Sequence, residues 1–178
     1  MSVFTLKSGE NILIESISIN DANLRHDFFY KLTKAQKGMV HTLDEIEQNS
    51  HESYDHISDF LRNRRGLWLK AQNEKGEIVG EVDITIKNLL RVNHNGNLTI
   101  GILPEYQGQG LGFALMNAAI LWAKNVRLKR IELSVFKNNF SAIKLYEKCG
   151  FIVEGVRKNF LRIDTDIFID DVLMAKYL

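Results

Sequence analysis

The distribution of hydrophobic and polar positions predicts a strand followed by two helices in the first third of the chain. Residues 12–19 form a dense apolar block that predicts a strand. Asp21 suits the start of a helix and Gly38 its end, and apolar side chains recur between them at helical spacing: Leu24, Phe28, Phe29 and Leu32. Residues 42–63 predict a second helix with a weaker apolar face and a break near Ser50.

The rest of the chain predicts mainly strands, joined by short turns and interrupted by two helices. A hairpin turn is predicted at residues 73–76 and another turn at Asn95-Gly96, a dipeptide typical of tight turns. Helices are predicted over residues 110–125 and 140–148, and strands over residues 66–71, 77–87, 98–103, 131–136, 151–156 and 167–176. This order indicates an α/β or α+β fold, in which a sheet carries helices on its faces.

Composition and charge narrow the possible classes of protein. We expect one domain spanning residues 1–178, because a chain of this size buries about 70% of its unfolded surface. The net charge is +1 and no apolar run approaches the ~20 residues of a membrane span, so we expect neither a nucleic-acid nor a membrane partner. Cys149 is the single cysteine, which excludes an intrachain disulfide, and the polar N-terminal residues favour a cytoplasmic location.

The most informative segment is a glycine-rich turn between a predicted strand and a predicted helix. It contains Gly108, Gly110 and Gly112, and the helix follows directly. The first turn of a helix has unpaired N–H groups and a favourable dipole, and glycine lets a phosphate approach the backbone, so the segment predicts an anion site. A tight turn without a ligand is one alternative. A dinucleotide-binding turn is another, although it expects G-x-G-x-x-G rather than G-x-G-x-G, and a P-loop is excluded because no Gly-Lys-Ser/Thr follows.

Two motifs, in this order, carry a resemblance to a known family. The stretch from Gln107 to Gly112 resembles the Q/R-x-x-G-x-G/A motif of the GNAT acetyltransferases. The stretch from Asn139 to Phe151 resembles that family's N-x-x-A-x-x-L-Y-x-x-x-G-F signature, and one predicted helix and one predicted strand separate the two motifs, as the family requires. The resemblance covers residues 77–178, and its C-terminal segments look like those of the subgroup of ribosomal-protein, amino-acid and diamine N-acetyltransferases.

The resemblance implies a fold and a cosubstrate. The fold is a mixed, mostly antiparallel central sheet of about seven strands flanked by about four helices, with a splayed cofactor slot between strands 4 and 5. The cosubstrate is acetyl-CoA, released as coenzyme A. The backbone at Ile100, Ile102 and Leu103 would pair with its pantetheine arm, and Pro104 fits a bulge there because proline donates no ladder hydrogen bond. The N–H groups of the turn and helix start would bind its pyrophosphate: Gln107, Gly108, Gln109, Gly110, Leu111, Gly112 and Phe113.

The same resemblance assigns roles in acyl transfer. Tyr146 matches the family's general acid, and a phenol of pKa about 10 can protonate a leaving thiolate whose conjugate acid has a pKa near 8.5. Without the motif, Tyr146 would be interpreted as a core aromatic. Asn139 matches the asparagine that bonds the cofactor arm, although it is equally suited to cap the helix that follows. The backbone N–H near Leu103 is expected to stabilise the developing oxyanion.

The general base is sought among carboxylates beside the cofactor strand. Glu81 and Asp83 lie two residues apart on the preceding predicted strand, so their side chains share one face. Either can take a proton from the amine directly or through water, and either can equally be a solvated surface group. We assign Glu81 as the catalytic base and keep Asp83 as the alternative, since residues 97–100 offer no carboxylate.

The expected function is transfer of an acetyl group from acetyl-CoA to a primary amine by direct attack on the thioester. The amine would be a small amine, an amino acid, a polyamine or a protein N-terminus. Several carboxylates either suit a cationic acceptor or form a solvated helix face: Asp44, Glu45, Glu47, Glu52, Asp55 and Asp59. The histidines lack metal-ligand spacing, so no metal is expected. A non-catalytic acyl-CoA-binding sensor or scaffold is the alternative function, and exposed sheet edges would allow a homodimer.

Overall fold

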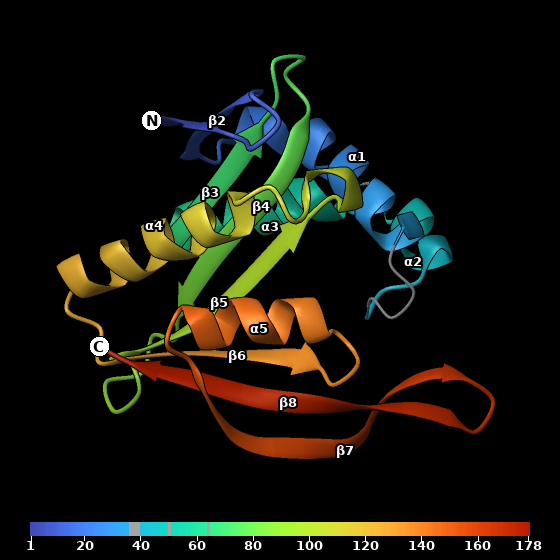
Figure 1. Ribbon diagram of the computed structural model, residues 1–178, viewed down its shortest axis with the longest axis vertical. Helices are drawn as coiled ribbons and strands as arrows, with labels where there is room; N and C mark the ends of the chain where they lie inside the picture. The colour runs from blue at the N-terminus through green and yellow to red at the C-terminus, as the bar shows by residue number, and fades with distance from the viewer. Residues whose placement is uncertain (36–39, 50, 64) are drawn as a thin grey trace.

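A single mixed sheet runs through the protein (Figure 1). The computed structural model describes residues 1–35, 40–49, 51–63 and 65–178, and within them the strand order is β1-β2-β3-β4-β5-β6-β8-β7. Neighbouring strands are antiparallel except β5 and β6, which are parallel. The strands are β1 (Ser2–Thr5), β2 (Asn11–Ser16), β3 (Gly66–Gln72), β4 (Ile78–Ile86), β5 (Asn95–Ile102), β6 (Arg130–Phe136), β7 (Ile152–Asp164) and β8 (Ile167–Tyr177).

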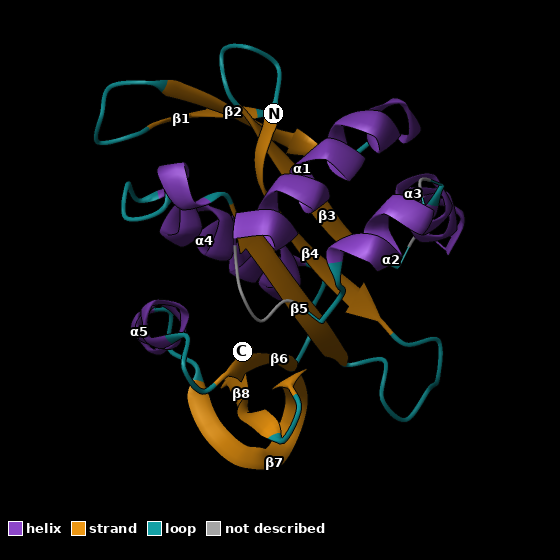
Figure 2. Cartoon of the chain, turned by 90° about the vertical axis from the view of Figure 1, so that its right-hand side faces the viewer, coloured by secondary structure: helices purple, strands orange, loops and turns teal. Residues whose placement is uncertain are grey.

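Helices cover both faces of the sheet, with α1, α2 and α3 on one face and α4 and α5 on the other (Figure 2). A Cβ added to Gly101 of β5 would lie 2.9 Å from Leu32 Cδ2 of α1. The next residue, Ile102, points the other way, because its Cδ1 lies 3.1 Å from where a Cβ of Gly112 in α4 would be. The helices are η1 (Ile19–Asp21), α1 (Ala22–Ala35), α2 (Leu43–Gln48), α3 (Glu52–Asn63), η2 (Pro104–Tyr106), α4 (Leu111–Asn125) and α5 (Phe140–Lys148).

The predicted fold class is confirmed, with small differences in the number of elements. Within the described residues the sheet has eight strands rather than about seven, because the four residues of β1 pair with β2 at the edge of the sheet. The predicted helix over residues 42–63 is two helices, α2 and α3, and the expected break at Ser50 and helix end at Gly38 lie outside the described residues. None of the helices that the structure describes is long and apolar enough to cross a bilayer.

The turn expected at Asn95-Gly96 is wrong, since both residues belong to β5. Asn95 pairs with Arg130 and Gly96 pairs with Ile86, so the dipeptide begins the strand. A Cβ on Gly96 would lie 2.6 Å from Ile84 Cγ2 and would also crowd the α4–β6 connection. Close packing against a neighbouring strand, rather than a turn, therefore requires glycine at this position.

The parallel strands β5 and β6 separate soon after they meet. Their paired residues are Asn95 with Arg130, Gly96 with Ile131 and Asn97 with Glu132. Both strands continue beyond this point, and Figure 1 shows them diverging toward their C-terminal ends. The open wedge is the slot that was predicted between strands 4 and 5, which are β5 and β6 once β1 is counted. We call it the β5–β6 slot, and its closed end lies at Asn97.

A buried ionic cluster fixes the start of α1 against the sheet. Asp21 was expected to cap the helix directly, but it belongs to the preceding turn η1, where its carboxylate accepts hydrogen bonds from the Ser18 N–H and hydroxyl at 2.8 Å. Lys70 of β3 reaches the same carboxylate at 2.6 Å and Glu15 of β2 at 3.2 Å. These contacts lower the pKa of Asp21 despite its burial. The entry to α1 is thereby tied to β2 and β3.

We predict that Gly66→Ala destabilises the fold more than Gly76→Ala. A Cβ on Gly66 would lie 2.1 Å from the Ile84 carbonyl oxygen, so β3 and β4 would have to shift, and we expect a loss of about 2–4 kcal/mol. Gly76 also has a positive φ, but a Cβ there meets nothing within 4 Å, and only the backbone cost of about 1 kcal/mol remains. Urea unfolding measures both, and equal losses would contradict the packing argument.

Candidate functional site

The glycine-rich turn exposes the start of α4. Gly108 and Gly110 have φ values of +71° and +94°, and a Cβ on Gly108 would meet nothing within 4 Å. Gly110 is the N-cap and has no side chain to cap the helix. The first helical bond runs from Ala114 N–H to Gly110 O, which leaves the N–H groups before it without helical acceptors. Such a helix start is a ready site for an anion.

Gln107 closes the turn instead of contributing to the set of free donors. Its N–H donates to Pro104 O at 3.1 Å, and its side-chain Nε2 donates to Ile102 O at 2.8 Å. Gln109 braces the other side, because its Nε2 donates to Glu105 O at 2.9 Å. The main-chain donors expected from Gln107 onward therefore begin at Gly108.

Gly112 allows three elements to meet at the first turn of α4. A Cβ there would lie 3.0 Å from Leu145 Cδ2 of α5 and 3.1 Å from Ile102 Cδ1 of β5. The neighbouring Leu111 is fully buried, so only its backbone faces the turn. Phe113 is partly exposed, and Lys148 of α5 places its Nζ 4.8 Å from the ring centroid. The helix start, the slot edge and α5 are thus packed as one unit.

The edge of β5 presents backbone groups to the β5–β6 slot. Leu103 N–H donates to Val79 O of β4 at 3.0 Å, which fixes the alternation of the ladder. Backbone groups of Ile100 and Ile102 then point away from β4 and toward the slot. The sequence placed Leu103 among the arm-binding residues and its N–H near the oxyanion. In the structure this N–H is already paired, and the slot-facing N–H nearest the turn belongs to Ile102.

Tyr146 and Asn139 lie on α5, beside the glycine turn. Tyr146 is buried and packs against Phe151 with ring centroids 6.1 Å apart. Burial, together with Cys149, raises the pKa of Tyr146 well above its usual value, so the phenol keeps its proton at neutral pH. Asn139 is the N-cap of α5, where its Oδ1 accepts from Ala142 N–H at 3.2 Å. The cap uses only the amide oxygen of Asn139, so its NH₂ group can still donate a hydrogen bond.

Glu81 lies in a buried cluster on the α1–α3 side of β4. Arg25 of α1 donates from Nε to Glu81 Oε2 at 3.2 Å and from Nη2 to Oε1 at 3.4 Å. The Trp68 indole N–H donates to the same Oε2 at 3.1 Å. Arg25 also donates to Ser53 Oγ of α3 at 3.1 Å. The structure thus brings the expected base together with a cation and an indole that occupy both of its oxygens.

Arg25 and Trp68 are members of this cluster that the sequence analysis did not single out. The guanidinium of Arg25 lies 4.8 Å from the Trp68 ring centroid and 5.4 Å from that of Phe29. A signal for Arg25 was present in the sequence, because it lies three, four and seven positions before the apolar residues Phe28, Phe29 and Leu32 of α1. An arginine on the apolar face of a helix has to find a buried partner.

Asp83 lies two residues further along β4 and is half-buried on the same face as Glu81. Burial is the main reason that the pKa of Asp83 is raised to about 7, and the charge of Glu81 adds to the rise. Arg25 and a hydrogen bond with the Thr99 side chain act in the opposite direction. Asp83 pairs with Thr99 across the β4–β5 ladder. A carboxyl group with a pKa near neutrality, one strand away from the slot, is suited to proton transfer.

The acidic residues of α2 and α3 are mostly solvated or engaged locally. Glu45 forms a capping box with Thr42, which lowers the pKa of Glu45. Glu52 lies 3.7 Å from both His41 and His56. Among the described residues, no group of three or more His, Cys, Asp or Glu side chains is arranged to hold a metal ion.

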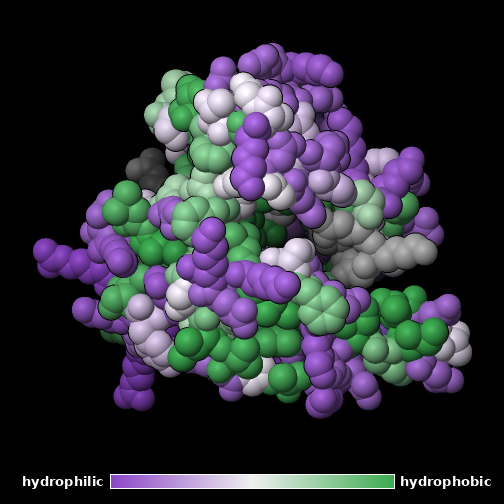
Figure 3. Space-filling model, in the orientation of Figure 1, coloured by the Kyte–Doolittle hydropathy of each residue, from purple (hydrophilic) through white to green (hydrophobic). Residues whose placement is uncertain are grey.

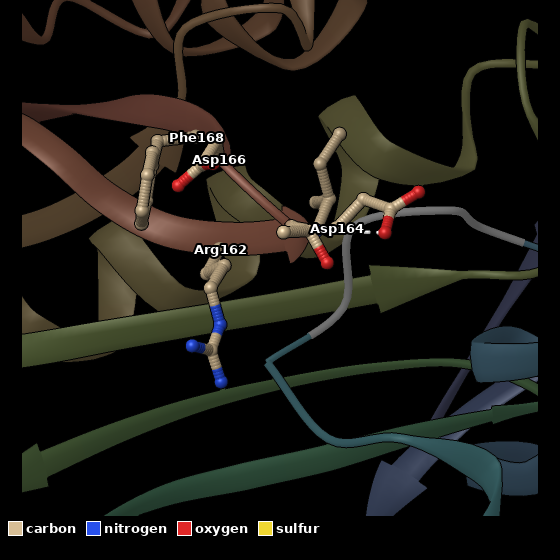
Figure 4. A pocket seen from close by; sticks show the side chains of 6 residues that line it. Arg162, Asp164, Asp166 and Phe168 are labelled. Atoms are coloured by element: carbon tan, nitrogen blue, oxygen red, sulfur yellow. Dashed lines mark hydrogen bonds between the residues drawn. The ribbon is translucent and has the colours of Figure 1, made fainter.

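Two surface hollows lie away from the glycine turn. One of about 400 Å³ lies at the tip of the β7–β8 hairpin, between side chains such as Arg162, Asp164 and Phe168 (Figure 4). Another of about 300 Å³ is lined by Trp122 and Leu128 at the opposite end of α4. Figure 3 shows a further depression at the centre of the face that carries α4 and α5, with hydrophobic side chains inside it.

Comparison with known proteins agrees with this geometry. Residues 27–151 match the family described as Acetyltransferase (GNAT) family. The chain is 31% identical over 143 residues to the L-amino acid N-acetyltransferase AaaT of Escherichia coli (strain K12), covering 77% of this chain and 87% of that protein. It is 30% identical over 115 residues to the spermidine N(1)-acetyltransferase of Vibrio cholerae, covering 64% of this chain and 61% of that protein.

A solved structure extends the likeness to the whole fold. An acetyltransferase of the GNAT family from Streptococcus pneumoniae superposes with a TM-score of 0.85 and 32% sequence identity, covering 94% of this chain and 99% of that chain. The family match, the splayed strands and the uncapped glycine-rich helix start agree with one another. The chain belongs to the acetyltransferase (GNAT) family and is an N-acetyltransferase.

Proposed function

We propose that the chain transfers the acetyl group of acetyl-CoA to a primary amine within the β5–β6 slot, by direct attack of the amine on the thioester. The observation that carries this proposal is the juxtaposition of the slot with the open start of α4. Gly112 joins them, since its missing Cβ lets Ile102 of β5 and Leu145 of α5 pack against the helix. A cosubstrate with a pyrophosphate and an amide-containing arm fits this combination of an anion site and a strand edge.

The binding roles follow from the free backbone groups. The pyrophosphate would accept hydrogen bonds from main-chain N–H groups between Gly108 and Phe113, which include those of Gln109, Gly110, Leu111 and Gly112. The pantetheine amides would pair with the slot-facing groups that remain free, which are the Ile102 N–H and the Ile100 carbonyl. The side-chain amide of Asn139 would donate to the arm while its oxygen caps α5. Gln107 would support the turn by its bond to Ile102 O.

The chemical roles follow from where charge develops. Attack on the carbonyl carbon produces an oxyanion, for which the donor would be the Ile100 N–H, because the ladder leaves it free and it lies nearer the closed end of the slot than Ile102 does. Collapse of the intermediate breaks the carbon–sulfur bond and yields a thiolate. Tyr146 would give its proton to the sulfur as the carbon–sulfur bond breaks, because its raised pKa keeps the phenol protonated at neutral pH.

The acceptor is proposed to be a small amine, an amino acid, a polyamine or a protein N-terminus. The relatives reported above are named for L-amino acids and for spermidine, which are two of these classes. An amine would approach from the face that α1 and α3 cover, where Glu81 and Asp83 provide negative charge. Thiol release from acetyl-CoA over L-amino acids, spermidine, aminoglycosides and short peptides tests the proposal. Cofactor binding with no thiol release from any of these amines would instead favour an acyl-CoA-binding sensor or scaffold.

We predict that acetyl-CoA stabilises the protein and that Gly112→Ala weakens this effect. A ligand that binds only the folded state adds about 2.7 kcal/mol at a concentration of 100 times its Kd, whereas ATP and NAD should add nothing. The added Cβ of Gly112→Ala would push the start of α4 away from Ile102 and Leu145, and we expect at least a roughly tenfold rise in the Kd for acetyl-CoA. Calorimetric titration and thermal unfolding measure both quantities.

The control for this variant is Gly9→Ala in the β1–β2 turn. Gly9 has a φ of +94° and open space where a Cβ would go, so its substitution carries a backbone cost without touching α4. It should lower the melting temperature and leave the Kd for acetyl-CoA unchanged. If Gly112→Ala binds acetyl-CoA as tightly as the control, the proposed placement of the pyrophosphate is incorrect.

We predict that Tyr146→Phe lowers kcat about 100-fold and leaves the Kd for acetyl-CoA within about twofold, because only the proton donor is removed. Steady-state thiol release with the best amine, together with calorimetric titration, measures both constants. Tyr177→Phe is the matched control, since the Tyr177 hydroxyl bonds Glu154 and Arg130 at the exposed end of β8. Unchanged kcat in Tyr146→Phe from pH 6 to 9 would remove Tyr146 from the mechanism.

A further inference from the structure

We infer that Asp83 takes the proton from the acceptor amine, and that the buried cluster of Arg25, Glu81 and Trp68 positions this carboxylate and sets the pH at which it works. The inference rests on the proposed function, since it assigns the base for the same transfer. It differs from the expectation that the sequence supported, in which Glu81 was the base.

Asp83 lies close to the closed end of the β5–β6 slot, with one strand between them. Strand β5 separates β4 from the slot, and Asp83 pairs across the β4–β5 ladder with Thr99. Thr99 is only two residues beyond Asn97, the last residue of β5 that pairs with β6. An arm that enters the slot from the start of α4 and runs along β5 carries its reactive end toward this closed end. The Asp83 carboxylate is therefore one strand away from the place where an amine must attack.

Asp83 and Tyr146 belong to opposite faces of the sheet. Asp83 and Glu81 belong to the face covered by α1 and α3, because Glu81 bonds Arg25 of α1. Tyr146 belongs to α5, which packs on the opposite face together with α4 (Figure 2). The slot passes between these faces. An amine that attacks from the side of Asp83 thus finds the proton donor for the leaving sulfur on the other side.

The contacts of Glu81 exclude it from direct proton transfer. Its side chain is only 10% exposed and accepts two hydrogen bonds from Arg25 and one from the Trp68 indole. A proton on Glu81 would leave the Arg25 guanidinium buried without its counter-charge, which is unfavourable for a buried ion pair. Glu81 is a positioning residue: Arg25 and Trp68 hold its carboxylate in place, and its charge acts on Asp83, its neighbour on β4.

Two charged groups and two neutral groups face the Asp83 carboxyl. From its own strand the charged neighbour is Glu81, and from α1 it is Arg25. The facing groups of the adjacent strands are neutral, with Trp68 on β3 and Thr99 on β5. Burial and Glu81 raise the pKa of Asp83 to about 7, and Arg25 and Thr99 hold it from rising further. The carboxyl is then basic enough to accept a proton and still ionised in a large fraction of molecules at neutral pH.

The transfer balances with these groups alone. The acceptor arrives as an ammonium ion, and one of its protons passes to the Asp83 carboxylate and from there to water. The free amine forms the carbon–nitrogen bond, and the carbon–sulfur bond breaks. Tyr146 gives its proton to the sulfur and regains one from water. The attacking nitrogen loses its second proton to the Asp83 carboxylate, and from there to water, in forming the amide. The products are the N-acetyl compound, coenzyme A and one proton.

The test is the pH dependence of kcat/KM from pH 5.5 to 9, with the amine that gives most thiol release in the panel. In the unmodified enzyme we expect a rise with a midpoint near 7. Asp83→Asn should lose this inflection and lower the plateau about 100-fold, with the Kd for acetyl-CoA unchanged. Glu81→Gln should move the midpoint about one unit toward acid, because it removes the like charge and leaves Arg25 in place.

Glu77→Gln is the matched control, since Glu77 is a half-exposed carboxylate just before β4 that pairs with Lys31 and bonds Asn73, away from the slot. It should keep both the midpoint and the plateau. Thermal unfolding of every variant shows whether it is folded. If folded Asp83→Asn keeps the original rate and pH profile, or if Glu81→Gln leaves the midpoint in place, the inference is overturned while the proposed function stands.

A titration of the carboxyl groups decides the matter even when no amine in the panel is acetylated. The probe is the full chain labelled with ¹³C at aspartate carboxyl carbons, with coenzyme A present, and Asp83→Asn identifies the signal. A midpoint near 7 that moves toward acid in Glu81→Gln supports the inference. A midpoint below 5 overturns it, whereas absence of thiol release alone counts against the proposed function.

Discussion

The separation of β5 from β6 is the constraint on which the rest of the site depends. An interior strand normally has both edges satisfied by its neighbours, and a backbone polar group kept from water without a partner costs free energy. Beyond Asn97 the slot-facing groups of β5 have no paired strand in the described sheet, and Gln107 fills only one position by bonding Ile102 O. The remaining positions suit a ligand that carries amides of its own. The glycine turn adds an anion site at the open end, so the slot selects a ligand with both features.

The buried charges on the other face link the acceptor side to the same strands. Removal of one partner from a buried ion pair costs about 3–5 kcal/mol, although the intact pair adds little net stability. The Arg25–Glu81 pair is therefore better understood as a device for position than as a source of stability. Through Arg25 it connects α1, α3 and β4, since the guanidinium also bonds Ser53. The wall that meets the acceptor and the carboxylate at Asp83 are consequently held by one set of contacts.

The sequence predicted those parts of the candidate site whose residues follow one another directly in the chain. The glycine turn and the start of α4 are contiguous, and the cap at Asn139 is set by the residues directly after it, so pattern alone predicted both. Gly96 was misinterpreted because a glycine required by a neighbouring strand looks the same in sequence as a glycine required by a turn. The N–H of Leu103 could not be assigned for a related reason, since its pairing with Val79 O depends on ladder register, which the sequence does not give. Arg25 and Glu81 are 56 positions apart, and periodicity carries no information on which buried charges meet.

This division between local and assembled parts bears on how such an enzyme acquires its acceptor. The cosubstrate side needs a turn, a helix start and one strand edge, all between β5 and α4, and these can stay constant while other segments change. The proposed acceptor side lies on α1, α3 and β4, which are brought together only by the fold and by the Arg25–Glu81 pair. Substitutions on the exposed parts of α2 and α3 can then alter which amine fits without disturbing the slot. Substitutions at Arg25 or Glu81 would instead change the electrostatic environment of Asp83. If Asp83 is the base, as we infer, the choice of amine and the pH range of transfer depend on different residues.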